Sequence, residues 1–267
     1  MADEGVIVHE YYSAPIGGQL LTICAPVGDD IGERIARRKL PYEWEALSIS
    51  DRMVRRLGDV IDVGANIGNH SLFWACESGA RVAAFEPPGY ALELLQKNLR
   101  LNKADGQVCI YPVAAGEKSG VGILHRVDGN LGASYLEVLD SSVGDVSDSI
   151  PVEPIDDFSF RGVGLIKVDV EGDELSVLVG ARETLRREQP AVWVEVLNAE
   201  ARRNVRIELR AVGYRVPPIW LSDTNAFFCP TWADAAFMIA CPRSAWLLLR
   251  RSIGRHYRSL RRALARR

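Results

Sequence analysis

Apolar residues along this 267-residue chain follow two different periods. Short unbroken apolar runs alternate with segments whose apolar residues stand three and four positions apart, a pattern typical of buried strands joined by amphipathic helices. The predicted strands span 59–63, 81–85, 108–113, 164–168 and 191–196, and the predicted helices span 69–78, 90–102, 173–187 and 199–212. This alternation predicts an α/β fold whose mostly parallel sheet is covered by helices on both faces.

Other segments flank or interrupt the alternation. We divide the chain into a leader at 1–56, a main domain at 57–242 with a small β-rich insertion at about 117–157, and a basic amphipathic helix at 243–267. Further strands are predicted at 7–12, 19–25, 120–126, 133–138 and 149–154, and a further helix at 43–57. Segments 214–217 and 235–240 are expected to close the sheet as an antiparallel hairpin.

Composition and charge exclude several classes of protein. Hydrophobic residues make up 48% of the chain and charged residues 25%, which suits one globular α/β domain. The net charge is −3, but residues 250–267 contain eight arginines and no acid, so the rest of the chain sits near −11. An acidic body of this kind does not suit a nucleic-acid partner, because phosphates favour a basic surface.

The five cysteines are scattered and odd in number, without C-x-x-C spacing, so neither a disulfide framework nor a zinc site is expected. Cys76 and Cys109 fall in apolar periodic segments and are interpreted as core residues. The acidic N-terminus lacks an apolar signal region, and no apolar run approaches the roughly 20 residues that span a bilayer. We therefore expect a cytoplasmic protein.

A glycine-rich turn follows the first strand of the alternation. Asp62 lies at the end of this strand, and Gly64 and Gly68 flank Asn66 in the turn that opens the next helix. Gly64 lets the backbone turn tightly and approach a ligand, and Gly68 allows close packing of helix and strand. Glu86 ends the next strand, where an acid can accept hydrogen bonds from both hydroxyls of a ribose.

Two classes of cofactor share this geometry. A dinucleotide places its pyrophosphate against free helix N–H groups, usually with a glycine where Asn66 stands, and the carboxylate of Asp62 would repel it. S-adenosylmethionine has an ammonium and a sulfonium and no phosphate, so Asp62 is compatible with it. The residues therefore favour S-adenosylmethionine over NAD. A catalytically inactive protein that only binds the cofactor also remains an alternative.

Several segments occur in a characteristic order. They are Asp62-Val-Gly-Ala-Asn-Ile-Gly68 with His70-Ser71, Phe85-Glu-Pro87, Pro112-Val-Ala-Ala-Gly116, Ile150-Pro-Val-Glu-Pro-Ile-Asp-Asp157 and Ile166-Lys-Val-Asp-Val-Glu-Gly-Asp-Glu174. This set resembles the FkbM family of methyltransferases over about 60–198. The resemblance implies a class I, Rossmann-like fold with a seven-stranded sheet, S-adenosylmethionine as methyl donor, and Ala114 among the cofactor-binding residues. It also implies O-methylation, mostly of sugar hydroxyls in glycans, glycolipids or natural products.

Asp169 and Glu171 are the leading candidates for chemistry. They follow the strand at 164–168, whose carboxyl end lies where open α/β sheets bind ligands. An extended backbone would put both side chains on the same side. We predict that Asp169 is the general base or binds the acceptor hydroxyl, with Glu171 in support and Asp169 also near the cofactor. Alternatively, Glu171 only favours the following helix N-terminus, or Asp169, Glu171 and Glu195 hold a divalent cation.

Other residues are weaker candidates. His70 could face the pocket from the first turn of its helix or be a capping group, and Glu195 ends another apolar strand at the same edge. Glu43 could bind the methionine ammonium of the cofactor or simply begin a helix. Lys167 lies in a buried strand and therefore needs an acidic partner. In the insertion, three residues could line the pocket or only form turns: Asn130, Gly132 and Ser134.

The arginine-rich segment at 243–267 has an apolar stripe and a basic face. It could lie peripherally on the inner face of an anionic membrane, pair with a partner or pack on the acidic body. The acceptor predicted for the whole chain is a small molecule, a glycan or a glycolipid, and the last of these would suit membrane contact.

Overall fold

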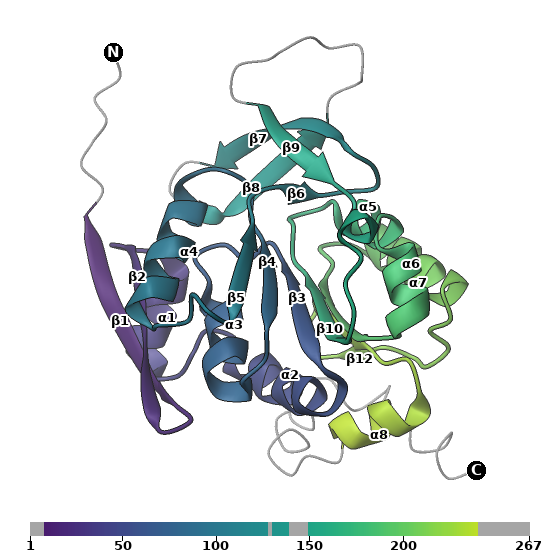
Figure 1. Ribbon diagram of the computed structural model, residues 1–267, viewed down its shortest axis with the longest axis horizontal. Coiled ribbons are helices and arrows are strands. Elements are labelled where there is room, and N and C mark those ends of the chain that lie inside the picture. Colours follow the sequence, from purple (N-terminus) through teal and green to yellow (C-terminus); the bar gives the residue numbers. More distant parts are fainter. Residues whose placement is uncertain (1–7, 128–129, 139–148, 240–267) are drawn as a thin grey trace.

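The computed structural model describes residues 8–127, 130–138 and 149–239 (Figure 1). Its centre is a seven-stranded sheet in the order β12-β13-β11-β10-β3-β4-β5. The strands are β3 (Asp59–Val63), β4 (Val82–Phe85), β5 (Val108–Tyr111), β10 (Val163–Val168), β11 (Ala191–Glu195), β12 (Ile219–Trp220) and β13 (Asn225–Phe228). Neighbours from β5 to β11 are parallel, and β13 is antiparallel to β11 and β12. The predicted mostly parallel, seven-stranded α/β sheet is confirmed.

Helices cover both faces of this sheet and define two hydrophobic cores. The first face packs against α2 (Trp44–Leu57), α3 (Asn69–Phe73), the π-helical turn η1 (Trp74–Ser78), α4 (Tyr90–Leu101) and α8 (Trp232–Ile239). The second packs against the 3-10 turn η2 (Ile155–Phe158), α5 (Glu174–Val179), α6 (Arg182–Glu188) and α7 (Ala199–Ala211). Gly180 and Ala181 separate α5 from α6, so the segment predicted as one helix at 173–187 is two.

Strand alternation decides which side chains meet at the carboxyl ends. In β3, Val60 belongs to the first core and Ile61 to the second, so Asp62 faces the same side as Val60. The same alternation puts Lys167 of β10 and Glu195 of β11 on this side. Register pairs Lys167 with Asp62, so the polar side chains of neighbouring strands gather on the α2 and α3 side of the sheet.

The leader packs on the same side as a hairpin of β1 (His9–Ile16) and β2 (Gln19–Pro26), followed by α1 (Asp30–Arg38), a helix that the sequence pattern did not predict. Asn98 of α4 joins this hairpin to the glycine turn. Its side chain accepts from the backbone N–H of Cys24 at 2.7 Å and donates to the carbonyls of Cys24 and Ile67 at 3.0 and 2.8 Å. The leader is therefore part of the support for the loop that follows β3.

The insertion forms a second sheet of four strands in the order β6-β9-β7-β8, above the carboxyl end of β5 (Figure 1). The strands are β6 (Ala114–Ala115), β7 (Gly120–Val127), β8 (Asn130–Val138) and β9 (Ser149–Glu153). The strands predicted at 120–126, 133–138 and 149–154 correspond to β7, β8 and β9. The proposed roles of Asn130, Gly132 and Ser134 fall on side chains outside the described part of the structure.

Two predictions near the C-terminus fare differently. The hairpin that closes the sheet is β12 and β13, and the segment predicted as a strand at 235–240 belongs to α8 up to Ile239. A helix is favoured there because it packs Phe237 against α2, under the guanidinium groups of Arg52 and Arg56. The predicted basic helix at 243–267 lies outside the described residues.

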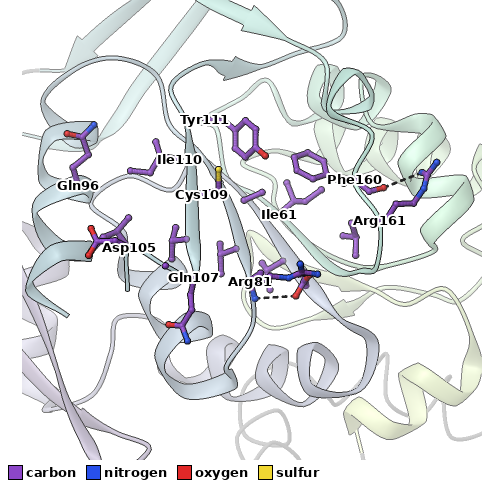
Figure 2. A pocket seen from close by; sticks show the side chains of 18 of the residues that line it. Ile61, Arg81, Gln96, Asp105, Gln107, Cys109, Ile110, Tyr111, Phe160 and Arg161 are labelled. Carbon is purple, nitrogen blue, oxygen red and sulfur yellow. Dashed lines mark hydrogen bonds and ion pairs between the residues drawn. The ribbon is translucent and has the colours of Figure 1, made fainter. Parts of the chain in front are cut away.

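A groove of about 620 Å³ runs over β3, β4 and β5 (Figure 2). Tyr111, Phe160 and Arg161 line one part of it, and none of the candidate site residues lines it. Cys109 lies exposed in this groove, so its predicted core position is wrong. The second core covers this face around β10 and β11, and β5 lies at the edge of the sheet, where less packs over it.

Candidate active site at the carboxyl ends of the central strands

The glycine turn after β3 is fixed by close backbone contacts. Gly64 has a φ of 74°, and a Cβ there would lie 1.9 Å from the carbonyl oxygen of Asp169. Gly68 has a φ of 91°, and its Cβ would meet Leu95 of α4 at 2.5 Å. The positive φ favours glycine at both positions, and at Gly64 the backbone oxygen also leaves no room for a Cβ. The predicted tight turn is confirmed, and at Gly64 the neighbour is the backbone of Asp169, directly after β10.

Glu86 reaches this turn from the end of β4. Its carboxylate accepts a hydrogen bond from the backbone N–H of Asn66 at 2.8 Å. The side chain is buried, and burial raises the pKa of Glu86 to about 7, although the Asn66 hydrogen bond and Lys167 oppose the rise. An acid thus stands beside the turn with acceptor capacity left for a ligand's hydroxyl groups.

Lys167 of β10 connects the turn to Asp169, which follows the same strand. Its ammonium donates to the carbonyl of Gly64 at 3.1 Å and lies 3.4 Å from Asp62 and 3.2 Å from Asp169. Asp62 is fully buried and also accepts from the hydroxyl of Ser71 at 2.6 Å. The prediction that buried Lys167 has an acidic partner is confirmed, and the partners are two.

The charges of Lys167 and Asp169 stabilise one another. Burial alone would lower the pKa of Lys167, but the carboxylates of Asp169 and Asp62 outweigh it and raise that pKa. Burial would likewise raise the pKa of Asp169, but Lys167, and then His70, hold it below its ordinary value. Asp169 is therefore an ionised carboxylate, and its side chain is still 27% exposed.

Glu195 stands beside Asp169 at the end of β11. One of its oxygens, Oε1, accepts from the Thr224 hydroxyl at 2.7 Å and from the Asn225 amide at 3.2 Å. The carboxyl groups of Glu195 and Asp169 also share a hydrogen bond. Burial, and then the charge of Asp169, raise the pKa of Glu195 to about 7. A carboxylate and a carboxyl group that titrates near neutrality are thus adjacent.

Glu43 and His70 close the same side of the site. Glu43 has a left-handed backbone, with φ of 54°, at the start of α2. Its carboxylate lies 3.2 Å from His70 Nε2 and 3.5 Å from the Asn225 amide. His70 is buried, and its ring meets Trp193 edge-on at 5.0 Å between centroids. His70 is therefore an internal residue that faces Glu43, and the predicted contact of Glu43 with the ammonium of the cofactor stays a prediction.

Glu171 does not take its predicted place. The strand ends at Val168, and Glu171 has a φ of 56°, so the extended backbone that would align it with Asp169 is absent at that position. Burial, followed by the nearby charge of Asp169, raises the pKa of Glu171. Its supporting role remains a prediction.

The divalent-cation hypothesis is not supported. In the part of the chain that the structure describes, no group of three or more His, Cys, Asp or Glu side chains converges as a metal site. The Asp169, Glu171 and Glu195 set fails because the turn at Glu171 breaks the alignment and because Lys167 already neutralises Asp169. The ammonium of Lys167 stands where a cation between Asp62 and Asp169 would be needed.

Buried acceptors near the turn are suited to S-adenosylmethionine. Asn66 Oδ1 lacks a hydrogen-bond partner, and so does Asp62 Oδ1 although Lys167 lies at ion-pair distance. S-adenosylmethionine offers an ammonium and ribose hydroxyls as donors to such acceptors, and Glu86 adds a third acceptor. A pyrophosphate would need free N–H donors, and the N–H of Asn66 is already bonded to Glu86. This set of hydrogen-bond acceptors therefore fits the sulfonium cofactor better than a dinucleotide.

The sequence analysis missed Ser71, Thr224 and Asn225 as site residues. Ser71 was visible as part of a family-like segment, whereas Thr224 and Asn225 gave no signal because their strand was predicted elsewhere. Ala114 lies in β6, where it is buried with Ile150 in the small sheet, and its predicted cofactor contact stays a prediction.

Comparison with known proteins identifies the family. The methyltransferase FkbM domain matches residues 62–216, which is more than half of the chain. The chain belongs to the FkbM methyltransferase family. The predicted family resemblance is confirmed. No curated protein matches the sequence significantly.

Three solved structures are similar at lower levels. An FkbM methyltransferase from Methylobacillus flagellatus has 24% identity and a TM-score of 0.47, and the match covers 64% of this chain and 43% of that one. A precorrin-6y C5,15-methyltransferase from Geobacter metallireducens has 12% identity, a TM-score of 0.41 and coverage of 70% and 86%. A putative caffeoyl-CoA O-methyltransferase from Staphylococcus aureus has 12% identity, a TM-score of 0.41 and coverage of 73% and 88%. The chain thus spans less than half the length of the first of these proteins.

Proposed function

We propose that this FkbM-family protein is an O-methyltransferase that moves a methyl group from S-adenosylmethionine to a hydroxyl group. The observation behind the proposal is the carboxylate of Asp169. It is ionised, partly exposed, and joined through Lys167 to the turn where Asp62 and Gly64 lie. A base beside a methyl-donor site is what transfer to a weakly acidic hydroxyl needs.

In this reaction the bound S-adenosylmethionine supplies an electrophilic methyl group, with a sulfonium as leaving group. Asp62, Asn66 and Glu86 would hold the donor through its ammonium and ribose. Asp169 would accept the proton of the acceptor hydroxyl as the new C–O bond forms and the C–S bond breaks. The helices and leader packed over the α2 and α3 side help to exclude water and to align the two reactants.

We further propose that the acceptor hydroxyl belongs to a sugar, in a glycan, a glycolipid or a natural product. Around Asp169 the site offers carboxylates, a hydroxyl and an amide from Glu43, Glu195, Thr224 and Asn225. Such a dense set of hydrogen-bonding groups matches a ligand with several neighbouring hydroxyls.

The cofactor proposal is tested by calorimetry with S-adenosylmethionine and with NAD. Binding of S-adenosylmethionine alone is expected, and binding of NAD alone would overturn the assignment in favour of a dehydrogenase. Cofactor binding without transfer to any member of a broad panel of sugar acceptors would favour a binding module instead. Mass spectrometry of a cell extract supplied with labelled methyl donor would identify the methylated product.

Asp169→Asn tests the base. The variant should keep its affinity for S-adenosylmethionine and lose about 10²-fold or more in kcat, because the proton acceptor is removed while Lys167 keeps Asp62 as a partner. Glu183→Gln is the matched control, because that carboxylate is 69% exposed on α6. Full activity of Asp169→Asn would remove the proposed role.

We also propose, from the sequence of 243–267, peripheral contact with an anionic membrane surface. Its arginines and apolar stripe are the chemistry that such a surface binds. The described residues contain no helix that is long and apolar enough to cross a membrane. Vesicle co-sedimentation should fall when 245–267 are deleted, and unchanged partitioning of the folded deletion variant would contradict the proposal.

A further inference from the structure

A chain of hydrogen bonds runs from Trp193 of β11 through Asn225 of β13 to Glu195 and the candidate base. The indole N–H of Trp193 donates to Asn225 Oδ1 at 2.7 Å, and the Asn225 amide donates to Glu195 Oε1 at 3.2 Å. Glu195 shares a hydrogen bond with Asp169, and Asp169 lies 3.2 Å from the ammonium of Lys167. Every hydrogen bond in the chain is buried or partly buried, so a donor or acceptor left unpaired there would destabilise the folded protein.

The two ends of this chain fix its direction. An indole N–H can only donate, so the Asn225 side chain must present its oxygen to Trp193 and its NH₂ group to Glu195. Thr224 also donates to Glu195 Oε1, at 2.7 Å. Oε1 therefore accepts two hydrogen bonds, and a proton on the Glu195 carboxyl group belongs on its other oxygen.

Such a proton is required by the contact with Asp169. Two ionised carboxylates have only acceptors and repel each other, so a hydrogen bond between them needs one proton. Lys167 lies against Asp169 and stabilises the negative charge there. No ammonium or guanidinium lies at ion-pair distance from Glu195 among the described residues. The proton is accordingly on Glu195, in agreement with the raised pKa of Glu195 and the lowered pKa of Asp169.

We propose that Glu195 is a positioning residue that works in its neutral form, donating its proton to Asp169 and holding that charged carboxylate in the orientation that receives the acceptor's proton. This inference rests on the proposed methyl transfer. During transfer the acceptor O–H bond breaks and its proton goes to Asp169, while the acceptor oxygen takes the methyl group and the sulfonium is released as a neutral thioether. Glu195 keeps its own proton throughout.

Ionisation of Glu195 should therefore abolish the arrangement. The titratable groups that act on Glu195 are Asp169, which directly follows β10, and Glu43 at the start of α2. Behind them, Lys167 of β10 pairs with Asp169 and His70 of α3 contacts Glu43. Both carboxylates oppose a negative charge on Glu195. As the pH rises through about 7, Glu195 loses its proton and Asp169 loses the donor that orients it. At saturating S-adenosylmethionine, kcat should fall on this alkaline limb.

The decisive variant is Glu195→Gln, because a glutamine amide donates to Asp169 and accepts from Thr224 and Asn225 at every pH. It should keep kcat within about threefold of the wild type near pH 6 and show no alkaline limb, whereas Glu195→Leu should lose about 10²-fold or more. Glu183→Gln serves as control and should keep the wild-type profile, because it is exposed on α6.

For a second variant we expect the alkaline limb of the pH profile to move instead of disappearing. The Thr224 hydroxyl stabilises ionised Glu195 and so lowers its pKa. Thr224→Val is nearly isosteric and should move the alkaline limb of the pH profile to higher pH, whatever its effect on the plateau value of kcat. A limb that moves to lower pH would contradict the proposal.

The remaining outcomes are equally distinct. Glu195→Gln that folds, binds S-adenosylmethionine and is inactive at every pH would make Glu195 itself the proton acceptor and overturn the proposal. An unchanged alkaline limb in this variant would overturn it too.

Infrared titration separates this inference from the methyl-transfer proposal, since it needs no acceptor. In a Glu86→Gln background, which removes another carboxyl group whose pKa is raised to about 7, a neutral carboxyl band should weaken as the pH rises through neutrality. Adding Glu195→Gln should remove that part of the band, and a difference spectrum between the two proteins with no neutral carboxyl band would refute the neutral form of Glu195.

Discussion

Glu86→Gln tests the idea that the Glu86 carboxyl group, which we place in the cofactor site, lowers the stability of the fold when it is ionised. Glu86 is 9% exposed, and burial raises its pKa from 4.5 to about 7. The folded state therefore holds the Glu86 proton more tightly than the unfolded state does. The stability that the neutral form contributes is fully present below the unfolded pKa and is lost as the pH rises through about 7.

The size of this effect follows from the shift. A change from 4.5 to about 7 corresponds to about 3 kcal/mol at one pKa unit per 1.36 kcal/mol. Glutamine has no ionisation to lose, and its side-chain oxygen can still accept the hydrogen bond from Asn66. In the cofactor-free protein, the free energy of unfolding of Glu86→Gln should rise by about 3 kcal/mol relative to that of the wild type as the pH increases from 5 to 8.

Urea unfolding of both proteins at pH 5 and pH 8 measures this difference, because contributions from other titrating groups are shared and cancel. Affinity should change in the opposite sense. Loss of the charged acceptor for the ribose hydroxyls should weaken S-adenosylmethionine binding by about 10- to 100-fold at pH 8, measured by calorimetry. Glu183→Gln should alter neither quantity. A stability difference that does not change with pH would refute the reasoning about Glu86.

Two further substitutions test the backbone and the buried charges. Gly64→Ala should lose roughly 3 kcal/mol or more in urea unfolding, because its Cβ would lie 1.9 Å from the Asp169 carbonyl oxygen at a φ of 74°. Gly79→Ala is the control, because Gly79 has a φ of 69° but open space around a Cβ, and a cost of only about 1 kcal/mol is expected. Lys167→Met should lose about 3–5 kcal/mol by leaving Asp62 and Asp169 without a counter-charge, and adding Asp169→Asn should recover part of that loss. Equal stability of the single and double variants would contradict that account.

Much of the cofactor side of the site could be predicted from the sequence. Asp62, Gly64, Asn66 and Gly68 form one continuous segment, and Glu86 ends the next strand, so their relation depends on local periodicity and on parallel strands ending at one edge. Asp169 follows from the same rule at a third strand. These residues were predictable because each is marked by a pattern within a short, continuous segment of the chain.

The acceptor side was decided by the tertiary structure. Glu43 and Asn225 are 182 positions apart, and they meet because the leader folds back over the sheet and a hairpin closes it. The same sequence pattern put the closing strand at 235–240, where packing of Phe237 on α2 makes a helix instead. The two-residue spacing of Asp169 and Glu171 also gave a wrong prediction for the direction of Glu171, because its left-handed backbone ends the extended conformation after Asp169.

The sequence by itself thus determined the α/β alternation, the family, and the residues of the glycine turn and strand ends. The tertiary structure alone decided which buried charges pair, which carboxyl group keeps a proton, and how Trp193 orients Asn225 toward Glu195. The physical reason is that periodicity records which face of an element is buried, whereas donor direction and ionisation depend on atoms a few ångströms away that distant segments supply.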